Sequence, residues 1–176
     1  MGKYNLQRKN VISWDAVFMA TTYLFSERSK DPNTQVGACI VDRNNRIISI
    51  GYNGTPNGWD DSDFPWAREG EELEKKYPYV VHAERNAILN YRGDNNIFQD
   101  AKIYVSHFPC HDCAKEIVQV GIKEVIYNND KYAYTDSIKE SKITLQNCGV
   151  VYREITDEVR EEIQKLFQGK GKTLIR

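Results

Sequence analysis

The sequence predicts an α/β protein of three layers, in which a five-stranded mixed sheet lies between helices. Segments with helical spacing alternate with short apolar segments in the order α-β-β-α-β-α-β-α-β-α. The length of 176 residues fits a single domain, 1–176, and 40% hydrophobic residues supply one sizeable core. The first two strands follow each other directly and should be antiparallel, whereas the later βα units favour parallel pairing.

The first helix is expected over residues 14–29, after Ser13, a residue type that commonly caps helix N-termini. The residues expected on its apolar face are Trp14, Val17, Phe18, Thr21 and Leu24. The segment DPN, 31–33, should end this helix. Two strands should then form a hairpin around the turn DRNNR.

The remaining elements follow from the same periodicities. Strands are expected over 36–41, 46–52, 102–107, 124–128 and 150–155, and further helices over 82–90, 110–120, 135–147 and 157–167. Gly121 and Gly149 fit helix C-terminal caps. Residues 168–176 predict a frayed tail.

Residues 53–79 form a long segment without regular periodicity, rich in Gly, Pro and Asp. Loops of this length in compact domains are usually functional or disordered. The large aromatic residues Trp59, Phe64 and Trp66 indicate an ordered loop that packs on something.

Charge is balanced, with 24 Lys+Arg against 25 Asp+Glu and a net charge of −1. This balance argues against a polynucleotide partner, which usually needs a basic face, but allows a small phosphorylated ligand. The chain has no apolar run long enough for a membrane span and no apolar core of a secretory signal at its start, so we expect no membrane association and a cytoplasmic location. In that setting a metal or catalytic use of the cysteines is favoured over disulfides.

Cys110 and Cys113 are spaced i, i+3 at an expected helix start, after Pro109. This spacing places both sulfurs over one turn, where free N–H groups and the helix dipole favour thiolates, the form that binds zinc. A second helix start, at His82, offers a third ligand. Three protein ligands leave the fourth tetrahedral position to water, which is the pattern of catalytic zinc sites.

Glu84 lies two residues after His82, and only in the first turn of a helix can both side chains approach one metal ion. A glutamate beside zinc-bound water, but not on the metal, can carry its proton. The alternatives are a structural zinc and a thioredoxin-like dithiol. The other soft donors available to a structural site are Cys39, Cys148, His107 and His111. Both of these cysteines are better explained as small hydrophobic residues, His111 should face solvent, and His107 should either touch substrate or pack.

The arrangement His82-Ala83-Glu84 with Pro109-Cys110-His111-Asp112-Cys113 matches the pattern of zinc-dependent nucleobase deaminases. Longer segments resemble the deoxycytidylate (dCMP) deaminases of the zinc-dependent cytidine/deoxycytidylate deaminase family. These segments are SKDPNTQVGACIV, GYNGTPNGW, LEKKYPYVVHAERNAI, FPCHDCAKEIVQVGIKEVIY and DKYAYTDS, and together they span residues 14–149. The resemblance implies the cytidine-deaminase fold, with zinc bound at two helix starts.

The resemblance also implies hydrolysis of dCMP to dUMP and ammonia, which feeds dTTP synthesis. His82, Cys110 and Cys113 would bind zinc, and Glu84 would protonate N3 of the base and later the leaving amine. Three alternatives stay open: a deaminase of another cytosine nucleotide such as dCTP, a deaminase of nucleic-acid bases, and a non-enzymatic zinc- and nucleotide-binding module.

The resemblance implies a substrate site made of Asn53, Val36, Ala83, Asn33, Thr34 and Tyr132. Asn53 would bind the sugar hydroxyl, the Ala83 backbone the pyrimidine edge, and Val36 and Tyr132 the base. By spacing alone, Asn53 is a turn residue and Val36 a core residue. The cations available for the 5′-phosphate are Arg28, Lys30 and Lys131.

Family members are usually homohexamers, activated by dCTP and inhibited by dTTP, with Mg²⁺ accompanying the nucleotide. The residues that resemble their effector loop are Gly51, Tyr52, Asn53, Gly54, Asn57 and Gly58. Two positions depart from the family pattern. Trp59 stands where other members can carry a cysteine that supports a further metal, so no second zinc is expected. Arg85 stands where an apolar residue is common, and we expect it outside the zinc coordination shell.

Overall fold

The computed structural model describes residues 7–168, and within them the elements follow the predicted order. The helices are α1 (Trp14–Ser26), α2 (Ala83–Asn90), α3 (His111–Gln119), α4 (Asp136–Asn147) and α5 (Asp157–Phe167). The strands are β1 (Gly37–Val41), β2 (Ile47–Tyr52), β3 (Lys102–His107), β4 (Glu124–Asn129) and β5 (Val151–Glu154). Two short 3-10 helices, η1 (Glu72–Glu74) and η2 (Asn95–Phe98), were not predicted. The predicted frayed tail lies outside the described residues, except for Gln168 at the end of α5.

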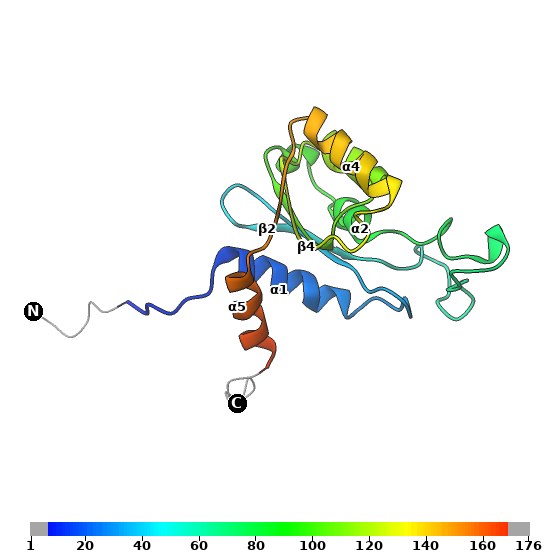
Figure 1. Ribbon diagram of the computed structural model, residues 1–176, viewed down its shortest axis with the longest axis horizontal. Coiled ribbons are helices and arrows are strands. Elements are labelled where there is room, and N and C mark those ends of the chain that lie inside the picture. The colour runs from blue at the N-terminus through cyan, green and yellow to red at the C-terminus, as the bar shows by residue number, and fades with distance from the viewer. Residues whose placement is uncertain (1–6, 169–176) are drawn as a thin grey trace, which may run out of the picture.

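The five strands form one mixed sheet in the order β2-β1-β3-β4-β5. β1 pairs antiparallel with β2 and with β3, whereas β3, β4 and β5 are parallel. One buried core lies between the sheet and α2, α3 and α4, and a second lies between the opposite face and α1 and α5. Figure 1 shows these layers, with α1 and α5 on one side of the sheet and α2 and α4 on the other. The predicted three-layer α/β/α class with a mixed sheet is confirmed.

The predicted helix starts rest on local capping, and the structure confirms them to within one residue, whereas α1 ends at Ser26, three residues before its predicted end. Ser13 Oγ accepts a hydrogen bond of 3.1 Å from the Ala16 N–H at the start of α1. Gly121 and Gly149 follow α3 and α4 with φ angles of +91° and +69°, the left-handed conformation that ends many helices. Within residues 7–168, no helix combines the length and the apolarity that a membrane crossing requires.

The predicted apolar face of α1 is confirmed at Phe18, which is buried, and is wrong at Trp14 and Leu24. Trp14 and Leu24 are 57% and 60% exposed, while the residues buried against the sheet are Ala16, Phe18, Met19, Thr22 and Ser26. The reason lies in the strand below, because a Cβ on Gly37 of β1 would lie 1.9 Å from the Thr22 carbonyl oxygen. The backbone of α1 therefore rests directly on β1, and a face of mostly small residues permits this approach where large residues would not.

On the opposite face, α2 makes a similarly close contact with β2. A Cβ on Gly51 would lie 2.3 Å from both the Ala83 carbonyl oxygen and the Ala87 amide nitrogen. Asn86 Nδ2 also donates a hydrogen bond of 2.8 Å to the Tyr52 carbonyl oxygen. These contacts fix the first turn of α2 relative to the hairpin.

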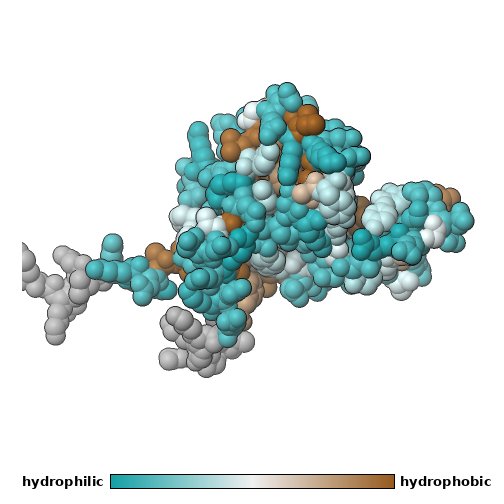
Figure 2. Space-filling model, viewed as in Figure 1, coloured by the Kyte–Doolittle hydropathy of each residue, from teal (hydrophilic) through white to brown (hydrophobic). Residues whose placement is uncertain are grey.

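The 53–79 loop is ordered and packs largely on its own aromatic residues. Phe64 is buried, and its ring centroid lies 4.5 Å from that of Trp66 and 5.2 Å from that of Trp59. The backbones of Gly54 and Val81 exchange two hydrogen bonds, which close the loop at its base. In Figure 1 the loop projects away from the sheet, and Figure 2 shows its outer surface as mainly hydrophilic. The sequence prediction of an ordered, packed loop is confirmed.

Candidate active site at the N-termini of α2 and α3

His82 and Cys110 occupy the N-cap positions of α2 and α3, and Cys113 lies in the first turn of α3. The backbone chemistry favours this arrangement, because each helix start presents unpaired N–H groups and the positive end of its dipole. The two helices bring His82 Nδ1 and the sulfur atoms of Cys110 and Cys113 within 4.8 Å of one another. The predicted ligand set therefore converges at one point.

The geometry of these three donor atoms fits a tetrahedral zinc ion. His82 Nδ1 lies 3.4 Å from Cys110 Sγ and 3.4 Å from Cys113 Sγ. Ligand bonds of ~2.3 Å to sulfur and ~2.0 Å to nitrogen, at a tetrahedral angle, would separate these atoms by about 3.6 Å. One imidazole and two thiolates are also the donor types that zinc prefers.

The protonation of the three groups is coupled. Hydrogen bonds from Cys113 and His82 lower the pKa of the Cys110 thiol to about 3. The hydrogen bond to Cys110 raises the pKa of His82 to about 9, and the same thiolate raises the pKa of Cys113. Without a metal, one thiolate is thus stabilised by two shared protons. A divalent cation at this point would replace those protons.

Glu84 lies beside the ligands in the first turn of α2 and is only 4% exposed. Burial raises the pKa of its carboxyl group, against the opposing effect of His82. A raised pKa makes the carboxyl group a better proton acceptor than a solvated glutamate, which suits a proton carrier. Its position and electrostatics match the proton carrier expected from the sequence.

The other cysteines and histidines do not join this group within residues 7–168. Cys39 is fully buried in β1, where burial raises the pKa of its thiol to about 12, and Cys148 is exposed. His111 is partly exposed, and its Nδ1 lies 2.8 Å from Ser137 Oγ. A closed structural site with four cysteine or histidine ligands therefore has no fourth donor in the described part of the chain.

A cavity of about 330 Å³ opens beside the donor atoms, close to the lower end of the ~300–1,000 Å³ range of ligand pockets. Five of the six residues expected at the substrate line it: Val36, Asn53, Ala83, Thr34 and Tyr132. Asn33 is exposed and does not line it; its N–H donates to Asp31 Oδ1 instead. His107 also lines the cavity, and its ring stacks on Tyr132 with centroids 6.5 Å apart.

The Asn53 amide is more fully bonded than the sequence suggested. Its nitrogen donates to the Thr34 carbonyl at 2.9 Å and to Asp31 Oδ2 at 3.3 Å, and its Oδ1 accepts the Val36 N–H at 2.8 Å. One lone pair on Oδ1 is left over. Asn53 can therefore accept a hydrogen bond from a ligand, whereas donating one would break a bond inside the protein.

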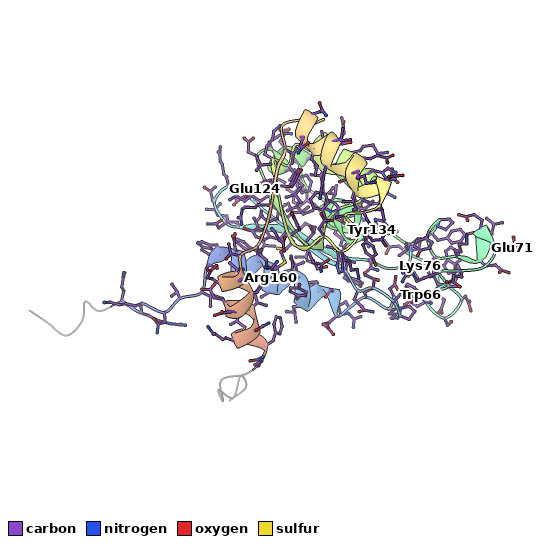
Figure 3. All side chains as sticks on the ribbon, in the orientation of Figure 1. Trp66, Glu71, Lys76, Glu124, Tyr134 and Arg160 are labelled. Atoms are coloured by element: carbon purple, nitrogen blue, oxygen red, sulfur yellow. The ribbon has the colours of Figure 1, made fainter. Side chains whose placement is uncertain are left out.

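Sequence reasoning missed two cations that the 53–79 loop brings to the cavity, Arg68 and Lys76. Lys76 forms a buried ion pair with Asp31, and the two side chains are 7% and 1% exposed. Figure 3 places Lys76 nearer to the body of the protein than Glu71, which lies at the end of the loop. By contrast, none of the three cations expected from the sequence, Arg28, Lys30 and Lys131, lines this cavity. Only a prediction of how the loop folds back could have identified Arg68 and Lys76.

A second cavity, of about 290 Å³, lies on the other side of the loop base. Its lining includes Tyr52, Gly54, Asn57 and Gly58 of the expected effector loop, together with Arg28, Lys30, Thr55, Pro56, Trp59, Asp61, Asn86 and Asn90. Two further residues of the expected effector loop lie elsewhere, since Gly51 packs under α2 and Asn53 faces the first cavity.

Arg85, whose role the sequence left open, connects the two helices of the donor group. Its Nε donates a hydrogen bond of 2.7 Å to Glu116 Oε1 on α3. The arginine side chain is 43% exposed, and the pair lies on the side of α2 that faces α3. Arg85 thus braces the two helices from outside the donor group.

Comparison with known proteins connects this site to one family. The family model described as "Cytidine and deoxycytidylate deaminase zinc-binding region" matches residues 12–129. Deoxycytidylate deaminase from Homo sapiens is 47% identical over 84% of this chain and 82% of its own length. The corresponding protein from Mus musculus is 46% identical over 85% of this chain and 84% of its own.

Solved structures agree with the sequence comparison. The crystal structure of dCMP deaminase from the cyanophage S-TIM5, in complex with dCMP and dUMP, is 31% identical with a TM-score of 0.61, over 79% of this chain and 94% of that chain. RibD from Acinetobacter baumannii, at 21% identity and a TM-score of 0.57, shares the fold alone. From its sequence, its fold and its His/Cys/Cys group, the chain belongs to the zinc-dependent cytidine and deoxycytidylate deaminase family.

Proposed function

We propose that this chain is a zinc-dependent deaminase that hydrolyses dCMP to dUMP and ammonia. The observation that carries the proposal is one cavity in which a His/Cys/Cys donor group, a buried glutamate and the residues expected around a deoxycytidine nucleotide meet. The named relatives, which are deoxycytidylate deaminases, support the choice of substrate.

His82, Cys110 and Cys113 would hold zinc, leaving one tetrahedral position for solvent. When bound, zinc supplies Lewis acidity that makes water nucleophilic near neutral pH. The protein contributes the position, because the starts of α2 and α3 bring the three donor atoms within 4.8 Å of one another. His82 and Cys110 also line the cavity, where a pyrimidine ring can approach the donor group.

Glu84 is the proposed proton carrier. Deamination adds water at C4 of cytosine and expels ammonia, so one group must take a proton from the water and deliver protons to N3 and to the leaving amine. The Glu84 carboxyl group lies buried beside the ligands, and its raised pKa allows it to alternate between the two protonation states. No other carboxyl group that lines this cavity is free for the task, because Asp31 is bonded to Lys76 and to the Asn33 N–H.

The remaining cavity residues would hold the base and the sugar. The backbone of Ala83 lies next to Glu84 and can meet the polar edge of the ring, while Val36 and Tyr132 offer apolar surface to its faces. Asn53 Oδ1 would accept the 3′-hydroxyl of the deoxyribose through its remaining lone pair. Thr34 lies nearby and would contact the sugar or phosphate.

The second cavity is the proposed effector site. Its lining combines cations, amides and glycine backbone, which suit a nucleotide triphosphate with Mg²⁺. Under this proposal dCTP activates and dTTP inhibits, as expected of an enzyme that supplies dUMP for dTTP synthesis. We also propose a homohexamer and a cytoplasmic location.

The direct test is the loss of ultraviolet absorbance when the purified, zinc-loaded chain is incubated with dCMP, with and without dCTP. Turnover of dCMP well above that of cytidine, dCTP and single-stranded DNA is expected. Turnover of one of those alternatives with none of dCMP would contradict the proposed substrate. A gel-shift with single-stranded DNA or RNA provides an independent check, and we expect no complex.

A further inference from the structure

Two cations from the 53–79 loop line the catalytic cavity, but only one of them has charge to offer a ligand. Lys76 is neutralised by Asp31 in a buried pair. Arg68 has no carboxylate within ion-pair distance among residues 7–168. Its Nε donates a hydrogen bond of 3.0 Å to Tyr77 Oη, while neither of its Nη groups has a partner in the same described range. The end of the cavity nearest the loop thus carries one uncompensated positive charge.

Arg68 is held in place although its side chain is exposed to solvent. The preceding residue, Ala67, accepts a hydrogen bond of 2.9 Å from the Lys76 N–H, and it pairs with Lys75 in a short parallel bridge. Lys76 is anchored by its ion pair to Asp31, which in turn bonds Asn53. The backbone before Arg68 is therefore connected through a short chain of contacts to the base of the cavity.

The Arg68 side chain is oriented as well. Tyr77 lines the same cavity, and its hydroxyl group occupies the Nε–H of the guanidinium. This contact leaves the two Nη groups as a planar pair of donors, a geometry that matches two oxygens of a phosphate.

We infer that Arg68 binds the 5′-phosphate of the nucleotide substrate and that Tyr77 positions its guanidinium group; the inference rests on the proposed function. Under the proposed function, catalysis takes place beside Glu84, which lines the same cavity. Arg68 accordingly determines which cytosine compounds bind, and it does not act in the chemical step. A nucleoside has no phosphate, so it makes no contact with the Arg68 guanidinium.

Substitutions of Arg68 test the inference through the ratio of kcat/KM for dCMP to that for deoxycytidine. Loss of a charge-assisted pair of hydrogen bonds costs a factor of ~10–100 in binding, so Arg68→Gln should raise KM for dCMP by about that factor with kcat little changed. The value of kcat/KM for deoxycytidine should stay within about threefold. Arg68→Lys, which keeps the charge but loses the planar fork, should lie between.

Two further variants separate recognition from structure. Tyr77→Phe should raise KM for dCMP by a few fold and leave deoxycytidine unaffected, because it removes only the group that orients the guanidinium. Arg43→Gln, at an exposed turn remote from the cavity, is the matched control and should behave as the unmodified chain. Inorganic phosphate should inhibit the unmodified chain competitively, and Arg68→Gln should lose this inhibition.

The inference is overturned if Arg68→Gln keeps the KM for dCMP of the unmodified chain, or if dCMP and deoxycytidine lose turnover equally. A chain that does not turn over dCMP at all overturns the proposed function. In that case calorimetric binding of dCMP and deoxycytidine still decides the role of Arg68. If Arg68→Gln leaves the dissociation constant for dCMP unchanged, Arg68 does not bind the phosphate. If the substitution raises the dissociation constant for dCMP but not that for deoxycytidine, the inference is supported.

Discussion

The two ends of the catalytic cavity are built differently. At one end, helix starts fixed on the sheet present His82, Cys110 and Glu84 within short segments of sequence. At the other end, the 53–79 loop presents Arg68 and Lys76 through side-chain contacts between segments distant in sequence. Under the proposed function, the helix starts would carry the chemistry and the loop would carry substrate choice. The comparison teaches that the donor group is positioned by local sequence patterns, whereas the cations of the loop are positioned by tertiary contacts that can vary separately.

The largest expected effect lies at the helix end. Glu84→Gln keeps the size of the side chain but removes its capacity to transfer a proton, so kcat for dCMP should fall by about 10³-fold or more. Zinc content, measured by atomic absorption, should stay at the unmodified level, since Glu84 is not among the donor atoms. The exposed Glu161→Gln is the matched control. Retained turnover would remove Glu84 from the mechanism.

The next largest effect should come from the ion pair that anchors the loop. Lys76→Met leaves Asp31 buried without its cation, which should lower the free energy of unfolding by about 3 kcal/mol and raise KM for dCMP. Lys75→Met is the control on the neighbouring residue. Among residues 7–168, Lys75 forms an ion pair only with the exposed Glu72, so this variant should change stability by less than about 1 kcal/mol. Urea unfolding measures both. Equal effects of the two variants would mean that the buried pair does not anchor the loop.

A smaller effect, on how stability depends on pH, is expected from His107, which lines the same cavity. Burial, aided by the charge of Lys131, lowers the pKa of this ring to about 4 from an ordinary 6.5. The unfolded chain then binds the proton more readily, so stability is fully present above pH 6.5 and is lost as pH falls toward 4. Because the ring is partly exposed, the loss should be about 1 kcal/mol.

Urea unfolding at pH 7 and at pH 4.5 should therefore show a steeper decline for the unmodified chain than for His107→Gln, which has no group titrating there. Comparing the two variants cancels contributions from other groups. Nuclear magnetic resonance of the His107 ring measures its pKa directly. A value near 6.5 would contradict the burial argument.

The smallest expected effect concerns Arg85, which braces α2 against α3. The pair with Glu116 is partly exposed, so Arg85→Ala should lower stability by only about 0.5 kcal/mol and lower the melting temperature by about 1–2 °C. Turnover of dCMP should stay within about twofold. Loss of zinc from this variant would show that the brace is needed to keep the donor group together.

The order of elements and the donor group were accessible from the sequence because both depend on local signals. Ser13 caps the start of α1 through its side chain, and Gly121 follows the end of α3 through its left-handed backbone. The spacing of Cys110 and Cys113 fixes their relative position on one helix. The burial of α1 was predicted correctly at Phe18 but wrongly at Trp14 and Leu24, since the orientation of the helix depends on its close approach to Gly37 of a strand, which the helix sequence does not show.

The loop end was not predictable for a similar reason. Residues 53–79 carry no periodicity, and nothing in their local sequence states that Lys76 reaches Asp31, 45 positions earlier. The hydrogen bonds of Asn53 likewise depend on three segments that meet only in the folded chain. Long-range polar contacts of this kind have no short sequence signature, although they decide which residues face the ligand.

The close contact between Gly51 and the first turn of α2 has a consequence for how mutations in this protein would be interpreted. Adding a single methyl group at this position would push away the helix start that carries His82 and Glu84. A loss-of-function screen would therefore score Gly51 alongside the catalytic residues, although it touches neither metal nor substrate. Such a map would count a residue of β2 as part of the active site, because the absence of a side chain at Gly51 is what lets α2 lie in its place.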